Sequence, residues 1–346
     1  MKRLASVLLF LGIAVLVFGS VILYMEKAAR QRADDVASTR FIRVYTDMPA
    51  DFIQTVGQAF ARKEKINIVV VPLTTSQILD STLRSDNTGD VVITSQEVLQ
   101  QLSEKKELAP YSSPASDTVM HQYRAENDTW TGIWIDPVVF AVNRDFYAEN
   151  PDYIYTWDNV VTSPMTRLSV TDFVSSSEAE DLLYSMSERF GEDGAIGRLA
   201  YAGTHIEQYG KFLSTPARMA AMDKVDIGIS SFNEVMRVKN EHLPIAVVYP
   251  DDGQPWYLYG IGIFSDAAHK PDARRFVDWL LTGKTLDKAM NASDTYYLST
   301  NELRRDKDER GHLLSLWNLK KVFVKTGRDS LKKRWVTQVR FARDTE

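Results

Sequence analysis

The sequence of 346 residues has no cysteine. This excludes disulfides, zinc sites with thiolate ligands and a lipid attached to an N-terminal cysteine. The sequence also lacks the motifs GxxxxGKS/T, HExxH and GxSxG, and it has no GxGxxG after a strand. Its five histidines, at positions 121, 205, 242, 269 and 312, are not at metal-ligand spacing. The sequence therefore predicts no enzyme activity, no cofactor and no bound metal.

Positive charge is also scarce. Lys and Arg number 41 against 46 Asp and Glu, and the net charge is -5. No basic field is available to hold a phosphate backbone, so we expect no nucleic acid partner. The 44% hydrophobic and 25% charged content is that of a globular protein. At about 150 residues per domain, the length predicts two lobes.

Residues 1–26 form a separate segment. Lys2 and Arg3 precede an uncharged run, residues 4–25, that is long enough to span a bilayer core. The run continues past the usual length of a signal peptide without a small-residue cleavage site. This favours an uncleaved transmembrane helix over a cleaved export signal, and both place the rest of the chain outside the cytoplasm. Residues 27–40 are polar and predict a tether.

Strand and helix patterns alternate through the first part of the chain. Apolar alternation and amphipathic spacing predict strands at 41–45, 67–71 and 90–93, followed by helices at 51–65, 75–85 and 96–105. Each strand ends in a Ser or Thr next to a helix N-terminus. Such alternation predicts a mainly parallel sheet, whose ligands bind at the carboxyl ends of the strands.

The stretch WTGIWIDPVVFAVNR, residues 130–144, predicts a largely buried strand interrupted by Pro137. A strand with a central proline can pass between two lobes. The alternation then resumes, with strands at 168–170, 225–229 and 245–249, and with helices after Thr156 and at 178–190. The run LYGIGIF, residues 258–264, is a candidate for the strand that returns from the second lobe to the first. An amphipathic helix follows at 271–282.

The order of these elements resembles the type II solute-binding proteins of ABC importers, in the branch that includes ferric-iron, phosphonate and phosphosugar binders. Nine stretches carry the resemblance: VYTDMP at Val44, AFARKEKINIVVV at Ala59, DVVITS at Asp90, WTGIWIDPVVFAVNRD at Trp130, TWDNVVTSP at Thr156, VTDFVSSSEAE at Val170, VDIGISS at Val225, VVYPDDG at Val247 and ARRFVDWLLTG at Ala273. They cover residues 41 to about 304.

The resemblance implies an α/β Venus-flytrap fold of two lobes, with the N-terminal transmembrane helix in addition. We expect lobe 1 to comprise residues 41–136 and 262–346, with the C-terminal helices packed on it, and lobe 2 to comprise residues 137–261. Two crossovers would join them. The implied function is to bind a small anionic organic solute, phosphorylated or a phosphonate, and to present it to the permease subunits. The protein would act as a monomer at the periplasmic or extracellular face of the membrane.

Hydroxyl groups at helix N-termini are the candidate binding groups, because backbone N–H groups and the helix dipole favour an anion there. The candidates are Thr46, Thr75, Ser76, Thr94 and Ser95 from lobe 1, and Ser175, Ser176, Ser177 and Ser230 from lobe 2. Any of them can instead cap its own helix. Trp134 can stack on a ligand or belong to the core. If Asp47 or Asp136 points inward, the solute would carry an amine.

Two other functions stay open. Iron binders of this branch use paired tyrosines after the strand that here ends in Ser230-Ser231, so a ferric site would need atypical ligands. An anchored binding protein can also report its ligand to a membrane sensor kinase.

Overall fold

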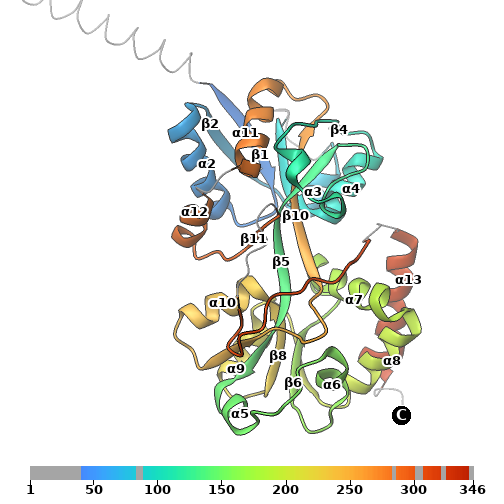
Figure 1. Cartoon of the computed structure of the whole chain (residues 1–346). Coiled ribbons are helices and arrows are strands. Elements are labelled where there is room, and N and C mark those ends of the chain that lie inside the picture. Colours follow the sequence, from blue (N-terminus) through green and yellow to red (C-terminus); the bar gives the residue numbers. More distant parts are fainter. Residues whose placement is uncertain (1–39, 83–88, 283–285, 301–306, 321–324, 343–346) are drawn as a thin grey trace, which may run out of the picture.

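The computed structural model describes residues 40–82, 89–282, 286–300, 307–320 and 325–342. The chain forms two α/β lobes, drawn one above the other in Figure 1, with long strands running between them. The expected two-lobed architecture is confirmed. The expected N-terminal transmembrane helix lies outside the described residues, and none of the described helices has the length and apolar character needed to span a membrane.

Lobe 1 contains a sheet covered by helices. Its strands are β1 (Phe41–Thr46), β2 (Asn67–Pro72), β3 (Val91–Ser95), β4 (Leu108–Ala109), β10 (Trp256–Phe264), β11 (Leu298–Ser299) and the first half of β5 (Trp130–Asn143). Its helices are α2 (Ala50–Glu64), α3 (Thr75–Leu79), α4 (Gln96–Glu104), α11 (Lys270–Thr282) and α12 (Leu286–Ala292), with short 3-10 turns η1 (Ser116–Thr118) and η2 (His121–Tyr123). The order β2-β1-β3 is parallel, and β10 and β5 follow antiparallel.

Lobe 2 contains the second sheet. Its strands are the second half of β5, β6 (Leu168–Thr171), β7 (Ile206–Gly210), β8 (Ile227–Ser231) and β9 (Ile245–Val248). Its helices are α5 (Arg144–Glu149), α6 (Trp157–Thr162), α7 (Ser177–Phe190), α8 (Glu192–Ala202), α9 (Thr215–Ala221) and α10 (Phe232–Asn240). β6 is parallel to β7 and β8, whereas β5 is antiparallel to β8 and β9.

β5 belongs to both sheets, and all of its residues are buried. Its residues up to Pro137 pair with β10, and from Val138 onward they pair with β8. The proline therefore stands where the strand changes sheets. It has no N–H to donate, and the next amide, of Val138, donates to the carbonyl of Pro255 at 2.8 Å.

A third connection joins the lobes. β11 pairs with β5 in lobe 1, whereas the carboxylate of Asp308 accepts a hydrogen bond from Tyr249 N in lobe 2 at 3.0 Å. The last helix, α13 (Lys325–Trp335), continues as the π-helical turn η3 (Val336–Arg340), and both pack on α8 while α13 also packs on α7. The prediction that the C-terminal helices pack on lobe 1 is therefore wrong for α13 and η3. Aromatic contacts of Trp335 with Phe173 and Tyr209 hold this end on lobe 2.

Candidate functional site

Two helices begin at opposite walls of a cavity between the lobes. α4 begins at Gln96 in lobe 1, and α7 begins at Ser177 in lobe 2. The cavity is lined by both lobes, by β10 and by α13: Ser95, Gln96, Glu97, Gln100, Ser177, Glu178, Asp181, Tyr257, Leu258, Tyr259 and Arg328. Its free volume of about 20 Å³ is room for about one water molecule. The lobes are therefore closed in this structure, and a solute can enter only when they separate.

Two hydroxyls at the start of α4, Ser95 Oγ and Thr94 Oγ1, have no partner at hydrogen-bond distance within the described part of the chain, although the Thr94 hydroxyl still interacts with the carboxylate of Asp47. Thr94 is fully buried. Ser95 stands at the N-cap of α4, but its side chain caps no amide of that helix. A buried polar group without a partner costs about 1–3 kcal/mol. A bound group that hydrogen-bonds to these hydroxyls would remove that cost.

Carboxylates face the same cleft from both lobes. Thr75 Oγ1 donates to Asp47 Oδ2 at 2.8 Å. Desolvation raises the pKa of Asp47, and the nearby hydroxyls of Thr94 and Thr75 partly offset this. Burial also raises the pKa of Glu178, and the charge of Asp47 raises it further. The cleft thus concentrates negative charge, which an anionic solute must overcome through hydrogen bonds.

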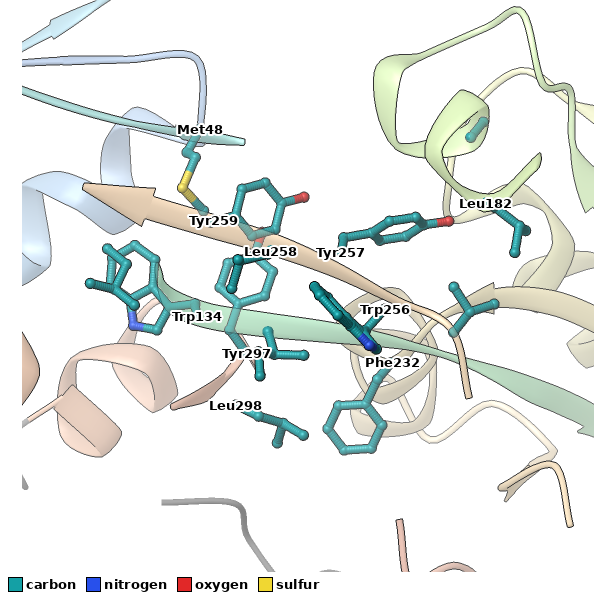
Figure 2. Packing of buried hydrophobic residues seen from close by; sticks show 14 of the residues in the cluster. Met48, Trp134, Leu182, Phe232, Trp256, Tyr257, Leu258, Tyr259, Tyr297 and Leu298 are labelled. Carbon is teal, nitrogen blue, oxygen red and sulfur yellow. The ribbon is translucent and has the colours of Figure 1, made fainter. Parts of the chain in front are cut away.

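Tyrosines of β10 form the floor of the cleft. Tyr257 and Tyr259 stand two residues apart and therefore project from the same side of the strand (Figure 2). Tyr259 Oη makes a long hydrogen bond of 3.5 Å to Glu178 Oε1. Burial raises the pKa of Tyr257, Tyr259 and Tyr297 well above the ordinary value of a phenol.

The described ranges contain no group of three or more His, Cys, Asp or Glu side chains arranged to hold a metal ion. Ser230 and Ser231 end β8 at the place where the iron-binding branch has paired tyrosines. Ser231 caps α10 through a hydrogen bond from Glu234 N.

A sequence model described as bacterial extracellular solute-binding protein matches residues 42–288. The chain belongs to this family. Its fold is that of the type II periplasmic binding proteins of ABC importers. The family model describes extracellular solute-binding proteins.

Similar proteins have different ligands. The periplasmic binding protein AfuA from Actinobacillus pleuropneumoniae, solved with fructose-6-phosphate, superposes with a TM-score of 0.70 at 21% identity, over 88% of this chain and 99% of that chain. Iron-bound HitA from Pseudomonas aeruginosa superposes with a TM-score of 0.71 at 15% identity, over 85% and 98%. An uncharacterized Haemophilus influenzae protein is 24% identical over 255 residues, 70% of this chain and 73% of its own length. At these identities the solved structures support the fold and leave the solute open.

The structure of this solute-binding protein brings only some of the candidate residues together. Ser95 and Ser177 line the cavity, whereas the hydroxyls of Thr94 and Thr75 lie against the carboxylate of Asp47. Ser177 Oγ lies 3.3 Å from Glu178 Oε2, so its hydroxyl serves a neighbouring carboxylate in the closed form.

The other predicted hydroxyls have local structural partners. Thr46 accepts from Met48 N, Ser76 pairs with Thr74, and Ser176 caps α7 by accepting from Ala179 N. Ser175 and Ser230 donate to the carbonyls of Asp172 and Leu213, at 2.7 and 2.6 Å. These contacts are turns, caps and loop closures.

Trp134 and Asp136 are buried near the hinge. Trp134 is 1% exposed and packs between Phe52 and Tyr297, at ring distances of 4.8 and 6.2 Å (Figure 2). It is therefore a core residue in the closed form and has no face open to a solute. Asp136 accepts a hydrogen bond from Asn233 N at the start of α10, at 2.9 Å. Its role here is to hold that helix to the hinge strand.

Sequence reasoning missed three kinds of cleft residue: Tyr257 and Tyr259, the inward carboxylates Glu97, Glu178 and Asp181, and Arg328. The two tyrosines had a detectable signal, because their spacing of two on a connecting strand puts both on one face. The sequence analysis took Glu178 for an ordinary first-turn helix charge, and it singled out neither Glu97 nor Asp181. Arg328 had no local signal, since its partners are 231 and 147 residues away.

Proposed function

We propose that this solute-binding protein captures a small anionic organic solute, phosphorylated or a phosphonate, and delivers it to an ABC permease. The solute's anionic group would lie between the N-termini of α4 and α7. The proposal rests on one observation above all, the buried hydroxyl of Ser95, which lines the cavity at the start of α4 and has no partner within the described residues. Helix N-termini favour anions, and hydroxyls complete such a site without a net positive charge.

The fructose-6-phosphate bound to AfuA, on a similar fold, supports a phosphorylated solute. A ferric solute is less well supported, because the described ranges hold no cluster of His, Cys, Asp or Glu ligands and Ser230 and Ser231 stand where the iron-binding branch has paired tyrosines. We also propose that residues 1–26 anchor the protein, which would act as a monomer at the outer face of the membrane.

A solute should raise the thermal stability of the purified protein. At about 100 times its Kd, it stabilises the folded state by about 2.7 kcal/mol. The screen would contain sugar phosphates, phosphonates, inorganic phosphate, polyamines and ferric iron. We expect Ser95→Ala to weaken binding of the stabilising compound about 10- to 100-fold, as a lost hydrogen bond to a charged group does.

Thr55→Ala is the matched control, because the Thr55 hydroxyl bonds only within α2, to Asp51 O. If only ferric iron or a polyamine stabilises the protein, the result would contradict the proposal that the solute is anionic. If no compound stabilises the protein, a sensory role becomes the better proposal.

Glu178→Gln should strengthen the binding of an anionic solute, because the substitution removes a partly buried negative charge from the cleft and keeps the side-chain shape. Isothermal titration calorimetry of both proteins with the compound found above would measure the change. Weaker binding by Glu178→Gln would show instead that a cationic group of the solute contacts this carboxylate.

A further inference from the structure

The last helix carries a charged residue into the contact between the lobes. α13 lies outside the segment that the family model matches and packs along α7 and α8 of lobe 2 (Figure 1). Arg328, in its first turns, is 3% exposed and lines the cavity between the lobes. Its guanidinium lies 4.3 Å from the ring of Tyr184 in α7. A buried arginine at this position needs anionic partners to offset its loss of hydration.

Arg328 finds those partners in both lobes. Its Nη2 donates to Asp181 Oδ1 of α7 at 3.0 Å, within lobe 2. Its Nη1 donates to Glu97 Oε2 of α4 at 3.4 Å, across the gap to lobe 1. One guanidinium, with its fixed fork of donors, thus joins the two lobes directly.

Without Arg328, the charges at this contact would repel. Closure brings Glu97 of lobe 1 toward Glu180 and Asp181 of lobe 2. Burial raises the pKa of Glu97, Arg328 lowers it, and Glu180 and Asp181 raise it again. Lys332 of the same helix pairs with Glu180 at 2.9 Å. The positive charges of α13 therefore offset the repulsion between carboxylates that meet when the lobes close.

We propose that Arg328 is a positioning residue for solute binding, and that α13 acts as a latch that stabilises the closed arrangement of the lobes. The closed population sets the apparent affinity for the solute, so Arg328 influences binding through the closure of the lobes. The link to affinity rests on the proposed function. The latch itself is a property of the protein without solute, and it can be tested separately.

The distance between the lobes gives the direct test. Because the chain has no cysteine, Gln58→Cys on α2 and Glu149→Cys on α5 introduce two unique labelling sites, both exposed. Single-molecule energy transfer between dyes at these sites reports closure in the full chain with no solute added. We expect Arg328→Ala to lower the ratio of closed to open molecules at least about tenfold, as expected when a buried ion pair loses one partner.

Two further variants separate the latch from a general structural role. Glu97→Gln added to Arg328→Ala removes the repelling carboxylate of lobe 1 and should restore much of the closed population. Arg334→Ala is the matched control, because Arg334 pairs with Glu192 and Asp193, which both belong to lobe 2. It should leave the distance between the lobes unchanged.

An unchanged distance in Arg328→Ala, or equal opening in Arg334→Ala, would overturn the latch. If Arg328→Ala does not fold, Arg328→Lys replaces it, since a lysine keeps the charge but cannot span both carboxylates. We then expect Arg328→Lys to be partly open, and added salt to restore the closed population by screening the repulsion between the carboxylates. An Arg328→Lys protein that is as closed as the parent would refute the proposal. Failure of the solute screen would leave these results unaffected.

Discussion

Gly228→Ala is expected to destabilise the protein by about 3 kcal/mol or more, the upper end of the cost of overpacking a core. Gly228 lies in β8, directly under α9. A Cβ at this position would lie 2.2 Å from the carbonyl oxygen of Pro216 and 2.5 Å from its carbonyl carbon. Both are backbone atoms, so the clash can be relieved only by moving α9 off the sheet. Urea unfolding of the variant and the parent protein would measure the difference.

Gly197→Ala is the control for this prediction. Gly197 lies within α8, and a Cβ there would meet no atom within 4 Å. Because alanine favours a helix over glycine, this variant should be more stable than the parent by about 0.5–1 kcal/mol. A Gly228→Ala protein with the unfolding midpoint of the parent would show that α9 can shift at little cost.

The parent protein is expected to lose stability as pH rises, and Asp136→Asn is expected to abolish the part of this loss that Asp136 causes. Asp136 is 2% exposed, and desolvation raises the pKa of Asp136 to about 8. The hydrogen bonds from Asn233 N and Ser231 oppose this shift, and the charges of Glu234 and Glu178 add to it. An unfolded aspartate titrates near pH 4, so the folded state holds one more proton between about pH 4 and 8.

The sign follows from this extra proton. The contribution of Asp136 to stability is fully present below about pH 4 and is lost as pH rises to about 8, with a slope of at most about 1.4 kcal/mol per pH unit. An asparagine keeps an oxygen that can accept from Asn233 N and does not titrate. Unfolding curves at pH 5 to 9 should therefore show a smaller pH dependence for Asp136→Asn and a stability advantage at pH 8 to 9.

Asp145→Asn, on the exposed start of α5, is the control for removing a carboxylate. Parallel pH curves of Asp136→Asn and the parent would show that Asp136 is ionised in the folded protein throughout this range. Asp47 and Glu178 also have raised pKa values and shift stability in the same direction. The contribution of Asp136 is therefore obtained from the difference in pH-dependent stability between Asp136→Asn and the parent protein.

Elements with strong local patterns were predictable from the sequence. The buried run from Trp130 predicted β5 to within a residue, and the stripe of Phe52, Val56 and Phe60 predicted α2. Their periodicities need no knowledge of the rest of the chain. The helix predicted over 75–85 ends at Leu79 instead. α8, β7 and α9 were not predicted, because their apolar residues are few or too evenly spread to show a period. α10 was not predicted either, although Phe232, Val235 and Val238 form a buried face at helical spacing.

The location of the site at the carboxyl ends of strands also followed from the sequence, since alternating strands and helices predict a parallel sheet with its helix N-termini at one edge. Which hydroxyls remain available did not follow. Ser176 and Ser95 both precede a helix, but Ser176 caps its helix and Ser95 does not. The difference depends on local backbone geometry and on the facing lobe.

The sequence by itself therefore determined the fold class, the family and the edge of the sheet where we propose that a solute binds, because these depend on periodicities and on the order of elements. The tertiary structure alone decided how the lobes meet. Arg328 contacts Glu97 across 231 residues of sequence, and α13 packs on lobe 2 after a third passage between the lobes. Contacts of this kind depend on the path of the whole chain, and no local pattern of residues encodes them.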